Sequence, residues 1–272
     1  MRELQQRGLP VRAYQGLVND PLRLREEVQG AEIVFHLASG ESSGKIRNLQ
    51  HVDVAGTRNL LEASRNAGVR RLIVMSRLGA DPNSIFPLLR AKGEVERMVQ
   101  RSGIPYTIVR SATLFGIEDR FLNSIAAMAA WTWPFVLVPG KGDSVLQPFW
   151  VEDLVQCLVL LLERPDLCDQ VLELAGEERL RYEVLVQIVL EAAGMNRIPV
   201  KTDLRLLRPL RAMAFGLRRK PPVTTFFLQR LSVPDVAAVD SVLRTFDFRP
   251  ERMVDHISYL RRRGWRRRLF RL

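Results

Sequence analysis

The chain has 272 residues, of which 47% are hydrophobic and 26% charged, so it can bury the core of a large globular protein. Two cysteines, Cys157 and Cys168, are too few for a disulfide framework and favour a reduced, cytoplasmic setting. The most apolar segment, residues 121–138, contains Asn123 and Pro134 and scarcely reaches spanning length. That pattern favours a buried helix followed by a strand over a membrane span.

The formal net charge is +11, and most of it lies in the last residues of the chain. Residues 256–272 hold seven arginines and no acid, which leaves +4 for everything before them. In the tail 259–272, Trp265, Leu269 and Phe270 are interspersed with these arginines. Nucleic acid would attract the charges without sequence preference, whereas an anionic membrane surface also has a use for the apolar side chains. A solvated tail is the first expectation from this composition. Between the two specific partners we prefer an anionic membrane surface, with the protein peripheral to the inner membrane, and we expect no specific nucleic-acid partner.

Strand and helix patterns alternate along the first 115 residues. Asp20 before Pro21 is a typical helix start, and Gly68 and Gly103 are typical helix ends. The run Ala31–Ala38 is apolar almost throughout, as in a strand buried on both faces. The alternation predicts an α/β fold with a doubly wound parallel sheet. The expected strands are residues 10–15, 31–38, 72–76 and 106–114, and the expected helices are residues 21–29, 49–67 and 87–102.

Beyond Gly116 the alternation is less regular. Prolines and arginines interrupt short segments from Asn196 onward, which predicts a smaller, mostly helical C-terminal lobe. We therefore divide the chain into a sheet domain, residues 1–175, a C-terminal lobe, residues 176–258, and the basic tail. The elements expected in the second half are helices at 121–131, 151–164 and 182–193 and short strands at 135–139 and 171–174.

A glycine-rich phosphate loop is not found near the start of the sequence. Gly8, Gly16 and Gly30 lack the spacing of a strand–turn–helix unit that holds a pyrophosphate. The strand at 10–15 must then pair with the strand at 31–38 or leave an open apolar edge, which is an aggregation hazard. Two interpretations stay open. The coding sequence begins upstream, with roughly 30–45 further residues of one βαβ unit, or the chain is a truncated relative that does not bind a cofactor.

Six segments, in their order and spacing, resemble the atypical, extended short-chain dehydrogenase/reductases. The branch with the best match contains NmrA-like proteins and the NAD(P)H-binding accessory subunit of respiratory complex I. The resemblance implies a Rossmann-like domain over 1–175 that lacks its first strand and phosphate loop, with NAD or NADP as the cofactor. The segments are HLAS (36–39), VDVAGTRNLLEAS (52–64), GVRRLIVMS (68–76), LLRAKGEVE (88–96), YTIVRSATLFG (106–116) and VPGKGDSVLQPFWVEDLVQ (138–156).

The resemblance also implies where the dinucleotide would bind. Asn19 and Asp20 match positions beside the adenine, although Asp20 is also a typical helix N-cap. Ala38 and Ser39 match a loop where small residues let the backbone approach the ribose. The segment that borders the nicotinamide in the family corresponds to Arg110, Ser111, Ala112 and Thr113. Ser76 and Lys92 complete the implied cofactor site.

The same two residues match the family's catalytic positions. Ser76 corresponds to the serine that polarises a substrate carbonyl, and Lys92 to the lysine that bonds the nicotinamide ribose and lowers the pKa of a tyrosine. Leu88 replaces that tyrosine, so the usual proton donor is lost. Asp53 stands where the family usually has asparagine. Taken singly, a serine at a strand end and a lysine on an amphipathic helix are more often structural.

Three functions follow from these patterns. The first is an NAD(P)(H)-binding protein with weak or no catalysis and a role in a redox assembly or its regulation. The second is an active NAD(P)-dependent oxidoreductase or nucleotide-sugar epimerase/dehydratase. The third is a membrane-peripheral scaffold that has lost its cofactor. The sequence predicts no metal site, and it leaves the substrate, the choice between NAD and NADP and the oligomeric state open.

Overall fold

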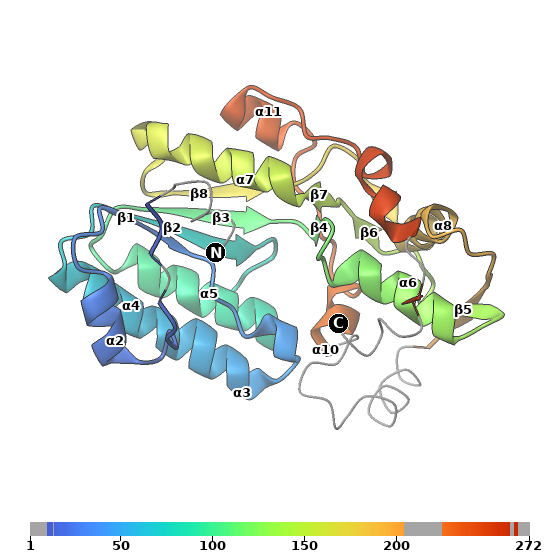
Figure 1. The fold of residues 1–272 in the computed structure, drawn as a ribbon, viewed down its shortest axis with the longest axis horizontal. Helices are drawn as coiled ribbons and strands as arrows, with labels where there is room; N and C mark the ends of the chain where they lie inside the picture. The colour runs from blue at the N-terminus through green and yellow to red at the C-terminus, as the bar shows by residue number, and fades with distance from the viewer. Residues whose placement is uncertain (1–9, 13, 204–224, 262–263, 266–272) are drawn as a thin grey trace.

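The computed structural model describes residues 10–12, 14–203, 225–261 and 264–265. Its centre is a four-stranded parallel sheet with strand order β1-β2-β3-β8. Helices α2, α4 and α5 cover one face of this sheet, and α7 and α11 lie on the other (Figure 1). The doubly wound α/β architecture is therefore confirmed. The four strands are Ile33–His36 (β1), Arg71–Arg77 (β2), Tyr106–Ser111 (β3) and Gln170–Leu174 (β8).

The prediction of a strand at residues 10–15 is wrong for the five of these residues that the structure describes. They adopt no regular structure, and Pro10 and Tyr14 are exposed. The fourth strand of the sheet is β8, which pairs with β3 at the opposite side. Among the described residues β1 pairs with β2 alone, so the other edge of β1 is open and Phe35 and Leu37 are exposed. A strand requires a hydrogen-bonding partner, and none of the described residues of this segment pairs with β1.

Of the helices on the face of the sheet that α2, α4 and α5 cover, α2 and α5 begin where the sequence predicts and α4 does not. α2 (Pro21–Glu27) starts at Asp20, whose carboxylate accepts a hydrogen bond from the Arg23 backbone N–H at 3.2 Å. The expected single helix over 49–67 instead begins as a π-helical turn, Leu49–Ala55, before α4 (Gly56–Asn66). Wide turns of this kind are frequent at functional sites. α3 (Ile46–Asn48) precedes it, and α5 (Pro87–Gln100) matches the expected helix.

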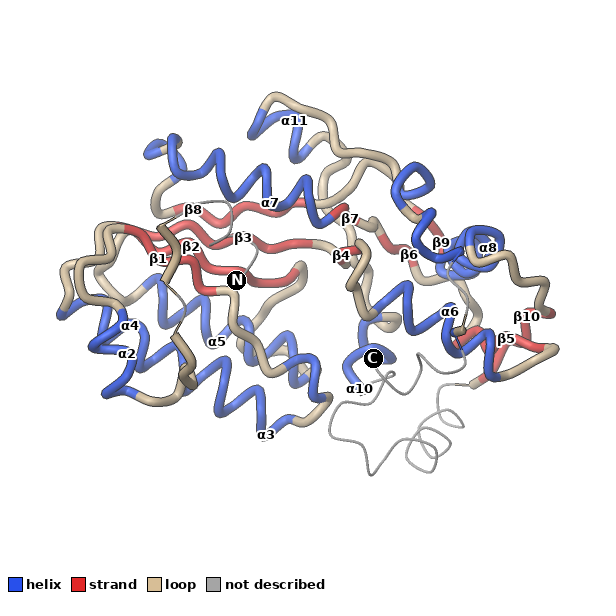
Figure 2. Tube along the Cα trace, viewed as in Figure 1, coloured by secondary structure: helices blue, strands red, loops and turns tan. Residues whose placement is uncertain are grey.

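A second lobe packs against the carboxyl end of the sheet (Figure 2). The expected strand 106–114 divides here: β3 ends at Ser111, and β4 (Leu114–Phe115) pairs with β7 (Phe149–Trp150) instead. A second pair joins β6 (Val145–Leu146) to β9 (Leu180–Arg181), and a third joins β5 (Phe135–Pro139) to β10 (Ile198–Thr202). The helices of this half are α6 (Phe121–Trp131), α7 (Val151–Leu160), α8 (Tyr182–Ala192), α10 (Thr225–Arg230) and α11 (Ser241–Phe246).

The apolar core of the second lobe draws on residues from Phe115 to Trp265. It therefore combines segments from both sides of the predicted division at 175/176, and that division stays a prediction. Trp265 is only 4% exposed, and its indole N–H donates to the Leu260 carbonyl at 3.0 Å. The expectation that Trp265 faces a membrane is therefore wrong, because the core already covers it. Leu269 and Phe270 lie outside the described residues.

None of the helices in the described ranges combines the length and the apolar character needed to cross a bilayer. The apolar segment 121–138 forms α6 and most of β5, as its asparagine and proline predict. Nine of the eleven residues of α6 are buried in the second lobe. The apolar side chains of this segment are therefore part of the core of the second lobe.

Candidate functional site

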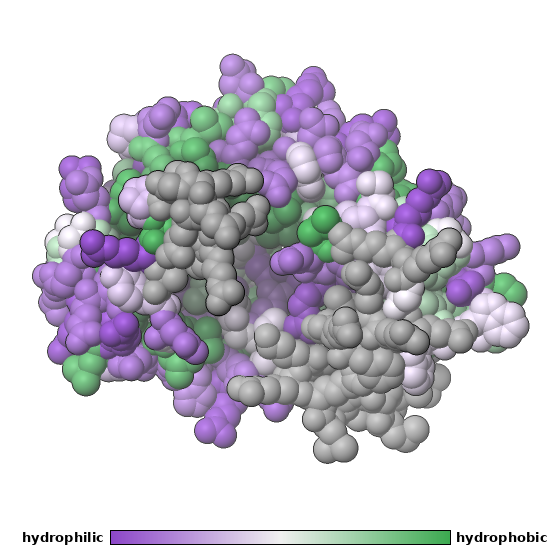
Figure 3. Space-filling model, viewed as in Figure 1, coloured by the Kyte–Doolittle hydropathy of each residue, from purple (hydrophilic) through white to green (hydrophobic). Residues whose placement is uncertain are grey.

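A cleft of about 1060 Å³ lies where the carboxyl ends of β1, β2 and β3 face the second lobe. This is the edge at which open parallel sheets bind their ligands. Figure 3 shows the molecule hollowed near its middle, with hydrophilic residues in the hollow. The sheet side of the cleft is built from the loop after β1, the end of β2 and the start of α5.

Four of the predicted site residues meet in this cleft: Ser39, Ser76, Lys92 and Ser111. The other six do not line it. Asn19 and Asp20 are exposed at the start of α2, and Ala38 is exposed after β1. Ala112 is fully buried in the core, and Thr113 donates its hydroxyl hydrogen to Asp235. Arg110 points at Glu96, as described below. The assignment of all ten residues to a cofactor stays a prediction.

Lys92 is paired with a buried carboxylate. Its Nζ lies 2.9 Å from Oδ1 of Asp53, and the two side chains are 8% and 1% exposed. Asp53 also accepts hydrogen bonds from the Ser39 hydroxyl at 2.8 Å and from the Gly40 backbone N–H at 2.7 Å. The π-helical turn carries Asp53, and α5 carries Lys92. An aspartate in place of asparagine therefore neutralises the lysine charge.

Ser76 is engaged by a second buried carboxylate. Its hydroxyl donates to Oε1 of Glu96 at 2.5 Å, and both side chains are about 3% exposed. Arg110 holds the same carboxylate through Nε at 3.0 Å and Nη2 at 2.7 Å. A serine hydroxyl has one hydrogen to donate. Ser76 therefore offers the cleft lone pairs and no proton.

Leu88 takes no part in the cleft wall. It is 4% exposed and packs in an apolar cluster with Leu49, Val54, Ala91 and Phe226. A space of only about 30 Å³ adjoins it. The position that carries the tyrosine in the family is thus filled by core packing.

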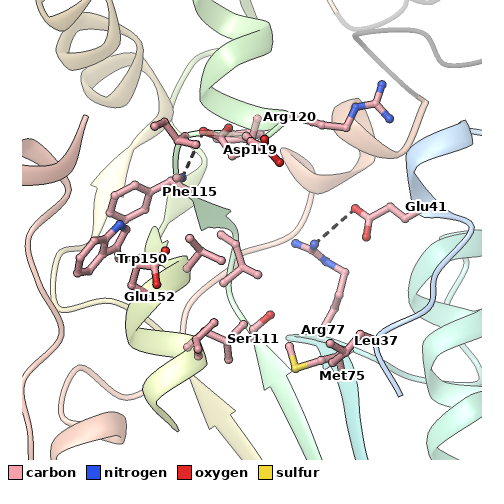
Figure 4. A pocket seen from close by; sticks show the side chains of 18 of the residues that line it. Leu37, Glu41, Met75, Arg77, Ser111, Phe115, Asp119, Arg120, Trp150 and Glu152 are labelled. Carbon is pink, nitrogen blue, oxygen red and sulfur yellow. Dashed lines mark hydrogen bonds and ion pairs between the residues drawn. The ribbon is translucent and has the colours of Figure 1, made fainter. Parts of the chain in front are cut away.

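A charged cluster that the sequence did not reveal crosses the cleft. Glu41, in the loop after β1, lies 3.4 Å from Arg77 of β2 (Figure 4) and 2.5 Å from Arg230 of α10. Burial raises the pKa of Glu41, but Arg77, Arg230 and Lys92 outweigh it and lower that pKa to about 2. Asp235 lies 3.6 Å from Arg77 and adds a second carboxylate to the cluster, so that its two arginines face two acids. No motif predicts this cluster, because its members come from distant parts of the chain.

The opposite wall of the cleft is aromatic. The His256 ring stacks on Trp150 with centroids 3.7 Å apart and planes at 19°. Nearby, the Tyr259 hydroxyl donates to Asp119 at 2.6 Å, and burial raises the pKa of this aspartate. Trp150 belongs to a segment that the sequence singled out, whereas His256 and Tyr259 had been assigned only to the end of the chain.

The cleft fits half of a dinucleotide. Its sheet side offers an ammonium group, two serine hydroxyls and a loop in which Gly40 is required, since an added Cβ would lie 2.5 Å from the Asn48 carbonyl oxygen. These groups suit a ribose and a carboxamide. The described residues contain no glycine-rich turn that leads into a helix beside β1 and could hold a pyrophosphate. The short helical turn that follows β1 carries the acidic Glu41 instead. The residues present therefore fit the nicotinamide-ribose half.

Comparison with known proteins agrees with this geometry. Residues 2–120 match a family model described as NAD(P)H-binding. The mitochondrial NADH dehydrogenase (ubiquinone) 1 alpha subcomplex subunit 9 of Rattus norvegicus is 29% identical over 218 residues, which are 80% of this chain and 57% of that protein. The chain thus spans little more than half the length of this relative.

Solved structures share the fold. An NADPH-dependent quinone oxidoreductase of Escherichia coli, solved with NADPH, has a TM-score of 0.74 at 20% identity, covering 95% of this chain and 86% of its own. A UDP-glucose 4-epimerase of Thermotoga maritima has a TM-score of 0.69 at 19% identity, covering 91% and 82%. The fold class is confirmed, and the match over 2–120 confirms NAD or NADP as the nucleotide class.

Proposed function

Since the chain is an atypical short-chain dehydrogenase/reductase similar to the NAD(P)H-binding accessory subunit of complex I, we propose that it binds NADH or NADPH in this cleft and transfers hydride weakly or not at all. Its role would then be to stabilise or regulate a redox assembly. One observation carries the proposal: both residues at catalytic positions are held by buried carboxylates, Lys92 by Asp53 and Ser76 by Glu96.

Binding and catalysis make different demands on these groups. A lysine ammonium has three hydrogens, and the Asp53 contact takes one, so Lys92 can still donate to ribose hydroxyls. A bound nicotinamide supplies or accepts a hydride, but the substrate oxygen must gain or lose a proton in the same reaction. Ser76 gives its hydrogen to Glu96, and Leu88 has none to give. The cleft is therefore suited to hold the nucleotide rather than to use it.

Isothermal titration of the whole chain with NADH and NADPH tests the proposal. Binding should be measurable, and Lys92→Met should weaken it, whereas the exposed control Ile85→Ser should leave it unchanged. The absorbance of reduced nicotinamide should stay constant when carbonyl substrates are added. Absence of binding at millimolar nucleotide would refute the proposal and favour a scaffold without cofactor.

A second candidate, an active oxidoreductase or epimerase, rests on Tyr259. This phenol lines the cleft and donates to Asp119, so it is a hydroxyl outside the usual motif. If turnover is found, Tyr259→Phe should abolish it and Lys92→Met should reduce it. Turnover that survives Tyr259→Phe would count against this assignment.

Association with a membrane through residues 259–272 is a further proposal. Fewer residues support it than the sequence suggests, because Tyr259 and Trp265 donate hydrogen bonds to Asp119 and Leu260 within the second lobe. What remains in the tail is a set of arginines with Leu269 and Phe270. Residual attraction to anionic lipid would then be largely electrostatic.

A further inference from the structure

Two buried arginines in the wall of the cleft have more hydrogen-bond donors than acceptors. Arg77 at the end of β2 and Arg230 at the end of α10 both line the cleft, and their side chains are 12% and 14% exposed. Each guanidinium carries five N–H groups. Toward the residues that the structure describes, the two arginines make only two hydrogen bonds. Both end on Oε1 of Glu41, at 3.4 Å from Arg77 and 2.5 Å from Arg230.

The other carboxylate of the cluster does not remove this surplus of donors. Asp235 lies 3.6 Å from Arg77, which is longer than a hydrogen bond. It accepts instead from the backbone N–H of Thr113 at 2.9 Å and from the Thr113 hydroxyl. Nε of Arg230 is buried and has no hydrogen-bond partner within the described ranges. Because buried polar groups in folded proteins are nearly always hydrogen-bonded, the surplus points to an acceptor that enters the cleft.

The arrangement of the donors favours a carboxylate as that acceptor. Cζ of Arg230 lies 5.3 Å from the centroid of the Phe121 ring, so the ring covers one face of the guanidinium and leaves its in-plane N–H groups for hydrogen bonding. The planar fork of a guanidinium matches the two oxygens of a carboxylate. A phosphate monoester would bring about 1.5 to 2 negative charges next to Glu41 and Asp235, whereas a carboxylate brings a single charge and less repulsion.

Apolar side chains line much of the same cleft. Leu37 and Ile117 are each 57% exposed and Val155 is 46% exposed, although all three line a cavity. Phe115 lies on the wall opposite Arg77 (Figure 4). The cleft volume of about 1060 Å³ is at the upper end for ligand pockets, which leaves room beside the nicotinamide-ribose half of a nucleotide. Apolar surface that stays open in a concave site is typical of ligand binding.

We propose that the cleft binds a small apolar monocarboxylate as a second ligand. Its carboxylate accepts hydrogen bonds from Arg77 and Arg230, and its hydrocarbon part lies on the apolar walls. Glu41 shares the two arginines with this carboxylate, so the negative charge of Glu41 weakens the binding of the ligand. The site is separate from the nucleotide proposal, because it uses neither Lys92 nor Ser76 and requires no reaction.

Isothermal titration of the whole chain without nucleotide tests this proposal. The probes are octanoate, the uncharged octanamide and octyl phosphate. Octanoate should bind, and octanamide should bind at least about tenfold more weakly, because its hydrogen bonds with the arginines lack the negative charge of a carboxylate. Octyl phosphate should also bind more weakly than octanoate.

Two variants with opposite effects assign the site. Arg230→Met should weaken octanoate binding at least about tenfold. The control Arg70→Met removes an arginine that is 73% exposed elsewhere, and it should bind octanoate like the wild type. Glu41→Gln keeps the size of the side chain and removes its charge, so it should strengthen octanoate binding at least about threefold.

The proposal is wrong if octanoate does not bind at millimolar concentration or if octanamide binds equally well. Tighter binding of octyl phosphate would overturn the assignment to a carboxylate. Equal affinity of Arg230→Met and the wild type would place the ligand elsewhere. If that variant does not fold, unchanged or weaker octanoate binding by Glu41→Gln decides against the proposal. Since no nucleotide is present, failure of octanoate to bind leaves the nucleotide proposal standing, and titration with NADH tests that proposal separately.

Discussion

Removing one member of the Lys92–Asp53 pair should cost far more than removing both. At 2.9 Å and an effective dielectric constant of about 20, two unit charges attract by about 6 kcal/mol, and desolvation of both ions offsets much of this. Loss of a single partner leaves the other charge buried and uncompensated. We therefore expect Asp53→Asn and Lys92→Met each to lower the free energy of unfolding by about 3–5 kcal/mol.

The double variant Asp53→Asn/Lys92→Met should lose much less than the sum of the two single losses. The measurement is guanidinium unfolding of the wild type, both single variants and the double variant, read by circular dichroism. An exposed pair provides the control: Arg70 and Glu32 lie 2.9 Å apart but are 73% and 71% exposed. Their coupling energy should be below about 1 kcal/mol.

A coupling energy for Lys92 and Asp53 no larger than that of the exposed pair would refute the reasoning. It would mean that water reaches the lysine and that its charge is not neutralised in the folded protein. The argument against proton transfer in this cleft rests on two buried pairs, Lys92–Asp53 and Ser76–Glu96, and only the second would then still support it. A coupling of about 2 kcal/mol or more would confirm that the lysine is held by its carboxylate.

Three further predictions concern single side chains. The pKa of Glu41 is lowered to about 2, so the folded state binds its proton less readily than the unfolded chain. Its contribution to the free energy of unfolding, at most about 3 kcal/mol, is present above pH about 4.5 and is lost as the pH falls to about 2. Glu41→Gln should remove this pH dependence of the free energy of unfolding in an acid titration. Burial, followed by Lys92, lowers the pKa of His36 to about 4. Protonation therefore favours the unfolded chain, and stability should fall by up to about 3 kcal/mol as the pH drops from about 6.5 to 4, a fall that His36→Gln should abolish. Leu88→Tyr should cost about 1–3 kcal/mol by overpacking and should create no turnover, which thermal unfolding and a reductase assay would check.

The sequence predicted the layers of the fold because these depend on periodicity within short segments. β2, β3 and α5 lie close to their expected bounds: the two strands are short continuous apolar runs, as in strands buried on both faces, and α5 has apolar residues at helical spacing. Residues 10–15 were also expected to form a strand, yet the five of them that the structure describes form none, because a strand depends on a partner that local sequence does not specify. The fourth strand of the sheet is instead β8, which pairs in parallel with β3 after the chain has passed through the second lobe.

The candidate site was predictable where a motif fixes a residue and not where distant residues meet. Ser76 and Lys92 were found by their place in the motif, and both line the cleft. Their partners Glu96 and Asp53 carry the argument about catalysis, but only the fold shows that the carboxylates reach them. The same holds for Trp265, whose position among arginines favoured lipid contact although its ring belongs to the core.

The two departures from the family pattern near Lys92 belong together physically. Positions 88 and 92 lie on one face of α5, so a tyrosine at 88 would bring a hydroxyl beside the lysine. With leucine there, the ammonium group loses a polar neighbour, and a buried charge needs compensation. Asp53, in place of asparagine, supplies that compensation from the π-helical turn. A tyrosine restored at position 88 would therefore lie beside a lysine whose positive charge Asp53 already compensates. Little net charge would remain to lower the pKa of the phenol. Loss of the acid and neutralisation of the lysine thus support one another, and both favour a cleft that retains a nucleotide without transferring a proton.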